Sequence, residues 1–179
     1  GAQSNTMTID LSLATTGTWT VPFPDGRAVY DPQEWVVVLY YEDLIVPAGK
    51  TVRFRNHGSR APVAMLATNS LTIEGTIDVS GESGDSANGP PRYAEPGPGG
   101  FRGARGTLFP TANDTSSGFG PGGGLRNTAA GSWMGNGAGH GTVGVVGVPS
   151  ANPPGAAYGQ HTLTRLVGGS GGGGALAAR

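Results

Sequence analysis

Residues 71–81 read Leu-Thr-Ile-Glu-Gly-Thr-Ile-Asp-Val-Ser-Gly, and this stretch decides the fold class. It contains two short units, 71–75 and 76–81, in which apolar and polar residues alternate until a glycine closes the unit. Alternation with a period of two is typical of half-buried strands, and short strands joined at single-glycine corners are typical of β-solenoid coils. We therefore expect an all-β chain built on a short right-handed parallel β-helix.

The residues before this stretch also read as strands. Trp35 to Tyr41 form a continuous run of β-branched and aromatic residues, which predicts a strand covered on both faces. Pro47-Ala-Gly49 reads as a corner and not as a tight hairpin turn such as Asn-Gly. For the stacked interior we expect five apolar residues: Ile45, Val52, Leu66, Ile73 and Ile77. The same strands also suit a β-sandwich with a glycine-rich tail, and this alternative stays open.

Glycine divides the chain into two unlike parts. Of the 34 glycines among 179 residues, six lie in residues 1–80 and the other 28 follow. Glycine loses more backbone entropy on folding than any other residue and has no side chain to bury, so the second part needs a template. We divide the chain into a β segment or cap at 1–42, β-helix coils at 43–81, a glycine-rich loop layer at 82–174 and a C-terminal tail at 175–179.

Two interpretations of the glycine-rich part compete. It could be a disordered linker, or an ordered loop system that lies over the flank of the solenoid in irregular or polyproline-II-like passes. We favour the ordered layer because aromatic and aliphatic residues are spaced through the glycines, and we expect them to anchor it. Phe119, Leu125 and Val145 are among these expected anchors.

Composition excludes several classes of function. The formal net charge is -1, Lys50 is the single lysine and the ten arginines are scattered, so the sequence shows no concentration of the cations that neutralise phosphates, and we predict no nucleic-acid partner. Without cysteine there is no disulfide scaffold, thiolate metal site or cysteine nucleophile. The longest apolar run, 35–41, is far shorter than a membrane span, so we predict no membrane insertion.

One acidic cluster could bind a metal ion. Asp78, Glu82 and Asp85 are close together in the sequence and could provide oxygen ligands for Ca²⁺ at a solenoid corner. Their spacing matches neither an EF-hand loop nor the nonapeptide repeat of calcium β-rolls. A solvated turn is the competing interpretation, and the chain gives no sign of any other cofactor.

A second candidate site is aromatic. Trp133, Tyr93 and Tyr158, together with Arg102, could form a platform for a glycan or a peptide, although the same residues would also serve as loop anchors. We predict no catalytic residues, and enzymatic activity is not expected. The match of 168–172 to a serine nucleophile elbow lies within pure glycine and carries no structural context.

Several motifs together give a family resemblance. They are Asp43-Leu-Ile-Val-Pro-Ala-Gly-Lys-Thr-Val52, Asn56-His-Gly-Ser-Arg60, Leu71-Thr-Ile-Glu-Gly-Thr-Ile77, Gly97-Pro-Gly-Gly-Phe-Arg-Gly103 and Gly168-Gly-Ser-Gly-Gly-Gly-Gly174. Over about residues 35–174 the chain resembles glycine-rich, parallel β-helix-like secreted and surface proteins of environmental bacteria. The resemblance implies a β-helix and an extracellular or cell-surface location, but no catalytic residue, because most such proteins have no assigned activity.

The end of the chain departs from that pattern. The related sequences usually resume β-helix coils after the glycine run, whereas this chain ends at Arg179. We therefore expect self-association into a homo-oligomer or fibre, or a second chain that continues the β-helix, since an unpaired sheet edge invites strand addition. The function that we expect is a non-enzymatic structural or adhesive one, and the alternative is a glycan-binding or polysaccharide-degrading β-helix protein.

Overall fold

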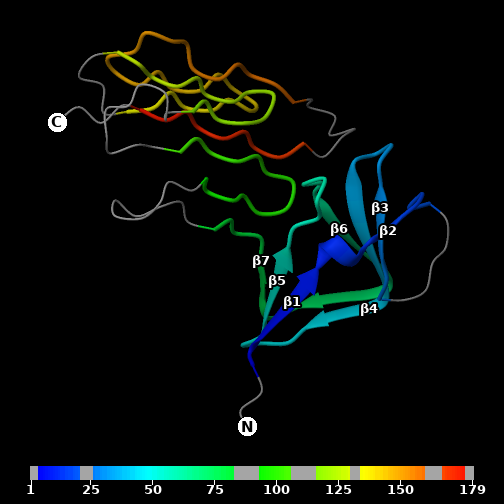
Figure 1. The fold of residues 1–179 in the computed structure, drawn as a ribbon. Coiled ribbons are helices and arrows are strands. Elements are labelled where there is room, and N and C mark those ends of the chain that lie inside the picture. The colour runs from blue at the N-terminus through cyan, green and yellow to red at the C-terminus, as the bar shows by residue number, and fades with distance from the viewer. Residues whose placement is uncertain are drawn as a thin grey trace. The chain divides into compact units, whose positions relative to one another are not determined.

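The computed structural model describes residues 4–20, 26–82, 93–105, 116–129, 134–159 and 167–175. The chain forms two compact units. Unit 1 comprises residues 1–80 and 97–99, and unit 2 comprises residues 81–96 and 100–179. All the strands of Figure 1 belong to unit 1, and each unit is described separately below. None of the described residues forms a helix long and apolar enough to cross a membrane.

Unit 1 is built from two sheets. The first is parallel with the strand order β1-β5-β7, and the second has the order β2-β3-β4-β6 (Figure 1). The elements in chain order are β1 (Thr6–Asp10), the 3-10 helix η1 (Leu11–Leu13), β2 (Thr15–Thr16), β3 (Ala28–Asp31), β4 (Val36–Val46), β5 (Thr51–Arg55), β6 (Val63–Ile73) and β7 (Thr76–Asp78). The prediction of an all-β chain is therefore confirmed.

The pairing alternates between the two sheets along the chain. Consecutive strands β4 and β5 lie in different sheets, and β6 then returns to pair with β4 while β7 returns to pair with β5. Both pairs are parallel, with Val37 opposite Val63 and Val52 opposite Ile77. Among the described strands, antiparallel pairing joins only β3 and β4, so the hairpins of the sandwich alternative are absent from residues 43–78.

The core of unit 1 surrounds the first half of β4. Val36 to Leu39 are all buried, as the continuous apolar run predicted for a strand covered on both faces. The central cluster is formed by Leu11, Val37, Leu39 and Ala61, with Phe54 and Met65 packed around it. Leu11 is completely buried, and Asp10 caps η1 by accepting a hydrogen bond from the backbone of Ser12 at 2.9 Å.

The predicted interior is only partly correct. Val52 is buried, and Leu66 and Ile77 are half-buried. The prediction was wrong for Ile45 and Ile73, because these residues are 61% and 47% exposed. On β4 the buried neighbours are Leu44 and Val46, which point to the face opposite to Ile45 because side chains alternate along a strand. Ile73 lies on β6, the last strand of its sheet.

Unit 2 contains no helix among its described residues and is held together by hydrogen bonds between extended segments. Several of these bonds repeat at intervals of three residues. The donors and acceptors are Phe101 N to Gly169 O, Ala104 N to Gly172 O, Gly124 N to Gly171 O and Asn127 N to Gly174 O. A sheet ladder does not repeat in this way, whereas a period of three matches the three residues per turn of a polyproline II chain.

The interior of unit 2 is backbone. Its buried described residues are Gly122, Gly124, Asn127, Asn136, Gly139, Gly147, Gly155, Gly171 and Gly174. Phe119, Leu125 and Val145, which we expected to anchor the loops, are exposed by 45%, 41% and 75%. These side chains are not buried between the segments, because segments that approach within hydrogen-bonding distance leave no room between them for large side chains, and their role as anchors stays a prediction. The position of the glycine-rich part over the solenoid stays a prediction.

Candidate functional site

The first candidate site lies in unit 2 around Tyr93. The guanidinium carbons of Arg102 and Arg105 lie 5.8 Å and 5.9 Å from the centre of the Tyr93 ring, and Phe119 meets this ring edge-on at 5.5 Å. Both arginines are within the distance at which a cation interacts with an aromatic ring. The structure thus brings together Tyr93 and Arg102, two of the predicted binding residues.

Backbone contacts hold this cluster in place. Phe119 donates from its backbone N–H to the carbonyl of Arg102 at 3.0 Å, and Arg105 donates from its backbone to the Ser116 hydroxyl at 3.1 Å. Arg102 also forms an ion pair with Glu95 at 2.5 Å, and this hydrogen bond raises the pKa of the Arg102 guanidinium above its ordinary value. An acidic or hydroxyl-rich group could bind to this cluster only through those guanidinium atoms of Arg102 and Arg105 that the internal contacts leave accessible.

Tyr158 belongs to a second cluster in unit 2. Its ring meets that of His140 edge-on at 4.8 Å, and its hydroxyl donates to the carbonyl of Gly168 at 2.5 Å. The Nε2 atom of His140 lies 2.9 Å from the carbonyl oxygen of Val167. These contacts join the segments around 140, 158 and 168, so Tyr158 serves as a loop anchor. The fourth predicted binding residue, Trp133, lies outside the described residues.

The predicted metal ligands are only partly described. The carboxylate of Asp78 forms an ion pair with Arg53 at 2.7 Å and accepts a hydrogen bond from the backbone of Ser80 at 2.9 Å. The hydrogen bonds from Ser80, followed by Arg53, lower the pKa of Asp78. Within the described ranges no three acidic or histidine side chains are grouped as metal ligands. Asp85 lies outside the described residues. The backbone N–H of Glu82 donates a hydrogen bond to the Glu95 carbonyl at 2.7 Å.

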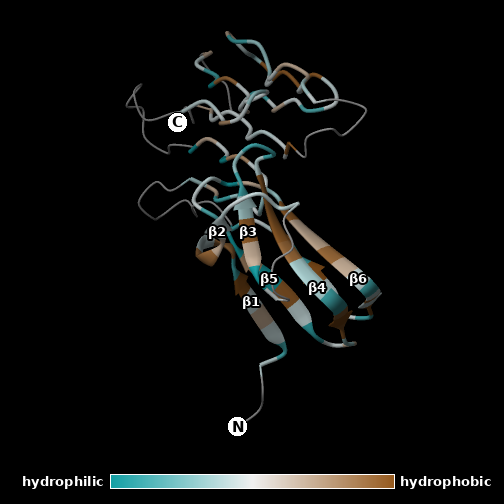
Figure 2. Cartoon of the chain, turned by 90° about the vertical axis from the view of Figure 1, so that its right-hand side faces the viewer, coloured by the Kyte–Doolittle hydropathy of each residue, from teal (hydrophilic) through white to brown (hydrophobic). Residues whose placement is uncertain are grey.

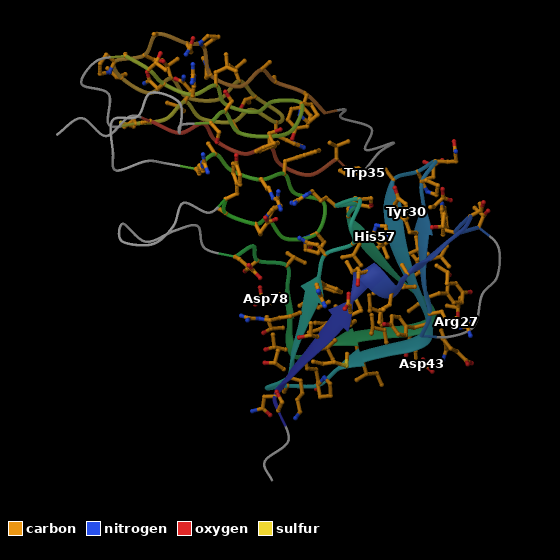
Figure 3. All side chains as sticks on the ribbon, in the orientation of Figure 1. Arg27, Tyr30, Trp35, Asp43, His57 and Asp78 are labelled. Carbon is orange, nitrogen blue, oxygen red and sulfur yellow. The ribbon has the colours of Figure 1, made fainter. Side chains whose placement is uncertain are left out.

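A polar and aromatic cluster in unit 1 was missed by the sequence analysis. The ring of His57 packs against Tyr30 at 4.3 Å, and Trp35 donates from its indole nitrogen to the Ser59 carbonyl at 3.2 Å. Figure 3 shows Tyr30, Trp35 and His57 close together, with Asp78 elsewhere in the unit. Trp35 and Arg60 both have left-handed backbone conformations, with φ values of 49° and 59°. Such conformations are uncommon outside glycine and are held by their surroundings.

The contacts of His57 explain what this cluster does. Its Nδ1 atom lies 2.7 Å from the Ser59 hydroxyl and also accepts the Ser59 backbone N–H at 3.1 Å. The same hydroxyl accepts a hydrogen bond from the backbone of Ala61 at 3.2 Å. All these bonds are local and define the turn between β5 and β6. The turn chemistry of 56–60 is visible in the sequence, but its packing on Tyr30 and Trp35 depends on long-range contacts.

No protein-family model, curated protein or solved structure matches this chain.

Proposed function

We propose that this chain is a non-enzymatic structural or adhesive protein of the extracellular space or the cell surface, in which unit 2 presents an apolar attachment surface. The observation that carries the proposal is the exposure of all four valines within residues 143–148. Val143, Val145, Val146 and Val148, called the valine ridge here, are exposed by 61%, 75%, 45% and 71%. Large apolar side chains gathered at a surface are typical of interaction sites.

The valine ridge follows from the way in which its segment is bonded. Gly144 donates to the carbonyl of Gly155 at 2.9 Å, and Gly147 donates to the side chain of Asn136 at 3.0 Å. The two glycines are three residues apart, so in a three-residue turn they lie on the same side of the segment, and the valines occupy its other sides. The backbone bonds therefore hold apolar side chains in solvent without any need to bury them.

The strand pairing of unit 1 supports a second part of the proposal. We infer that β4 to β7 are coils of a parallel β-solenoid, as in the glycine-rich surface proteins that the sequence resembles. The partners lie about one coil apart in sequence, since Val37 pairs with Val63 and Val52 with Ile77. The antiparallel β3, which pairs with β4 on the other side, supports a role of the preceding residues as a cap.

An adsorption experiment tests the attachment function. The full chain is passed over a methyl-terminated surface and a hydroxyl-terminated surface in a quartz crystal microbalance. We expect retention on the methyl surface, and at least about a tenfold loss of affinity in the double variant Val145→Asn/Val148→Asn. The variant Ala157→Asn adds a similar side chain at an exposed position outside the valine ridge and serves as the control. Equal retention of all three proteins would contradict the proposal.

A further inference from the structure

The outer edge of β6 is the longest free strand edge in the described part of unit 1. The four strands at the ends of the two sheets are β1, β2, β6 and β7, with 5, 2, 11 and 3 residues. β6 pairs with β4 on one flank, and its backbone forms no bond on the other flank to any described residue. In Figure 2, β6 is the last strand of its sheet, beside β4. An edge of this length is a template for another strand.

β6 lacks two of the features that protect natural edges from pairing, charge and proline, although it carries a bulge between Ala67 and Ser70, opposite Glu42 of β4. Its sequence, Val-Ala-Met-Leu-Ala-Thr-Asn-Ser-Leu-Thr-Ile, contains no proline and no charged residue. The edges of the parallel sheet differ, because β1 carries Asp10 in an ion pair with Arg55 and β7 carries Asp78 in an ion pair with Arg53. Charge and short length blunt those edges, whereas β6 has neither.

The apolar residues at the end of β6 continue a buried row. Leu71 pairs with Leu44 and Ile73 pairs with Val46, so each pair lies on one face of the sheet. Leu44 and Val46 are 8% and 2% exposed, but Leu71 and Ile73 are 57% and 47% exposed. β3 pairs with β4 only through Val36 to Leu39, so at Leu44 and Val46 no described strand lies on the second flank of β4, and strand neighbours do not account for this difference in exposure. A strand added at β6 would cover the second flank of both side chains.

We propose that the occupant of this edge is the β6 edge of a second copy of this chain, in antiparallel pairing about a two-fold axis. Such pairing closes both free edges at once, as isologous dimers do. Because β6 carries no charge, two identical strands meet without like-charge repulsion. This inference goes beyond the proposed function and names the partner for the self-association that the sequence analysis expects, through residues other than the valine ridge.

The first test is the mass of the full chain in solution, measured by sedimentation velocity over a range of concentrations. We expect a dimer that the substitution Leu71→Lys weakens by at least about tenfold in dissociation constant. Ile45→Lys adds the same charge at an exposed position of β4 in the same sheet, and we expect it to change the constant by less than about twofold. Equal weakening by both variants would point to association through the sheet face and would overturn edge pairing.

The second test uses the absence of cysteine from the chain. Thr68 is the middle residue of β6, lies at its bulge and is exposed, so in the proposed two-fold pairing we expect a single Thr68→Cys substitution to place one thiol near its symmetry mate. Mild oxidation of the Thr68→Cys variant should give a disulfide-linked homodimer, whereas the same oxidation of the Ile45→Cys variant should not. A monomeric wild-type chain that still adsorbs to the methyl surface would overturn the β6 inference and leave the attachment function standing. A dimer that fails to adsorb would overturn the attachment function and leave the β6 inference standing.

Discussion

The side-chain oxygen of Asn136 accepts a hydrogen bond from the backbone N–H of Gly147 at 3.0 Å, and both residues are buried. The amide nitrogen of Asn136 donates to the carbonyl of Leu125, also at 3.0 Å. One side chain thus satisfies backbone groups of two other segments. Asn127 acts in the same way, donating to the carbonyl of Pro149 at 2.7 Å and accepting from the backbone of Ala129 at 3.1 Å.

Replacing Asn136 with alanine should therefore destabilise unit 2. The substitution leaves a buried N–H and a carbonyl without partners, at a cost of about 1–3 kcal/mol for each group. Hydrogen exchange monitored by mass spectrometry should show faster exchange in residues 134–147 while β4 and β6 stay protected. Asn152→Ala removes a hydrogen bond at the exposed Arg126 carbonyl and serves as the control. Unchanged protection in the Asn136 variant would contradict this role.

Two glycines of the same segment should respond differently to alanine. A Cβ atom at Gly171 would lie 1.9 Å from the carbonyl oxygen of Arg102, whereas a Cβ atom at Gly169 would meet nothing within 4 Å. We expect Gly171→Ala to destabilise the chain by about 1–3 kcal/mol through overpacking, and Gly169→Ala to be neutral or slightly stabilising. Chemical denaturation followed by circular dichroism measures both. Similar losses in the two variants would mean that the close approach does not limit the segment.

The leucines of η1 form a matched pair in unit 1. Leu11 is 0% exposed within the core and Leu13 is 79% exposed, although both belong to the same three-residue helix. Leu11→Ala should lower the free energy of unfolding by about 2–5 kcal/mol, because it leaves a cavity beside Val37 and Leu39. Leu13→Ala should change it by less than about 0.5 kcal/mol. Urea titrations of the two variants under the same conditions measure both changes in the free energy of unfolding.

Asp31 should make unit 1 sensitive to acid. Burial alone would raise the pKa of Asp31, but hydrogen bonds from the backbones of Trp19, Gln33 and Glu34 outweigh it and lower the pKa below its ordinary value. A carboxyl group whose pKa is lower in the folded than in the unfolded state stabilises the fold above the unfolded pKa, and this contribution is lost as the pH falls through the folded pKa.

The melting temperature should therefore fall as the pH drops below about 4, the ordinary range of an aspartate. Asp31→Asn should lower the melting temperature at neutral pH and flatten its decline in acid, since the amide cannot ionise. Glu34→Gln replaces an exposed carboxyl group nearby and serves as the control. An Asp31→Asn variant with the acid profile of the wild type would assign the acid sensitivity to other groups.

Several strands of unit 1, such as β4, could be predicted from the sequence because they have a local signal, whereas β2 and β3 were not predicted. The apolar run 35–41 predicted a strand covered on both faces, and Val36 to Leu39 are buried. It was harder to predict which side of a strand faces the core, because a shift of one residue exchanges the two faces. In the stretch Leu44-Ile45-Val46 all three residues are apolar, so the pattern could not show that Ile45 is the exposed one.

Unit 2 could be predicted less well, because its order depends on contacts between backbone groups. The sequence shows which residues are glycine but not which carbonyl each one meets, such as that of Arg102 at Gly171. Large hydrophobic residues usually lie in a core, but the four valines of the valine ridge are exposed. The pairing of Tyr93 with Arg102 was suggested by residue type, whereas the contacts of His57 with Tyr30 and Trp35 required the fold.

The three-residue bonding of unit 2 has a consequence for how such a chain can diverge. Its order is specified by glycines and by two buried asparagines, so the side chains that point outward carry little of the folding information. Under the proposed function, we expect that exchanging a valine of the ridge for another residue alters what the surface attaches to and leaves the scaffold in place. We therefore propose that the unit is a display frame, in which binding specificity can change under selection while the positions of glycine are held fixed.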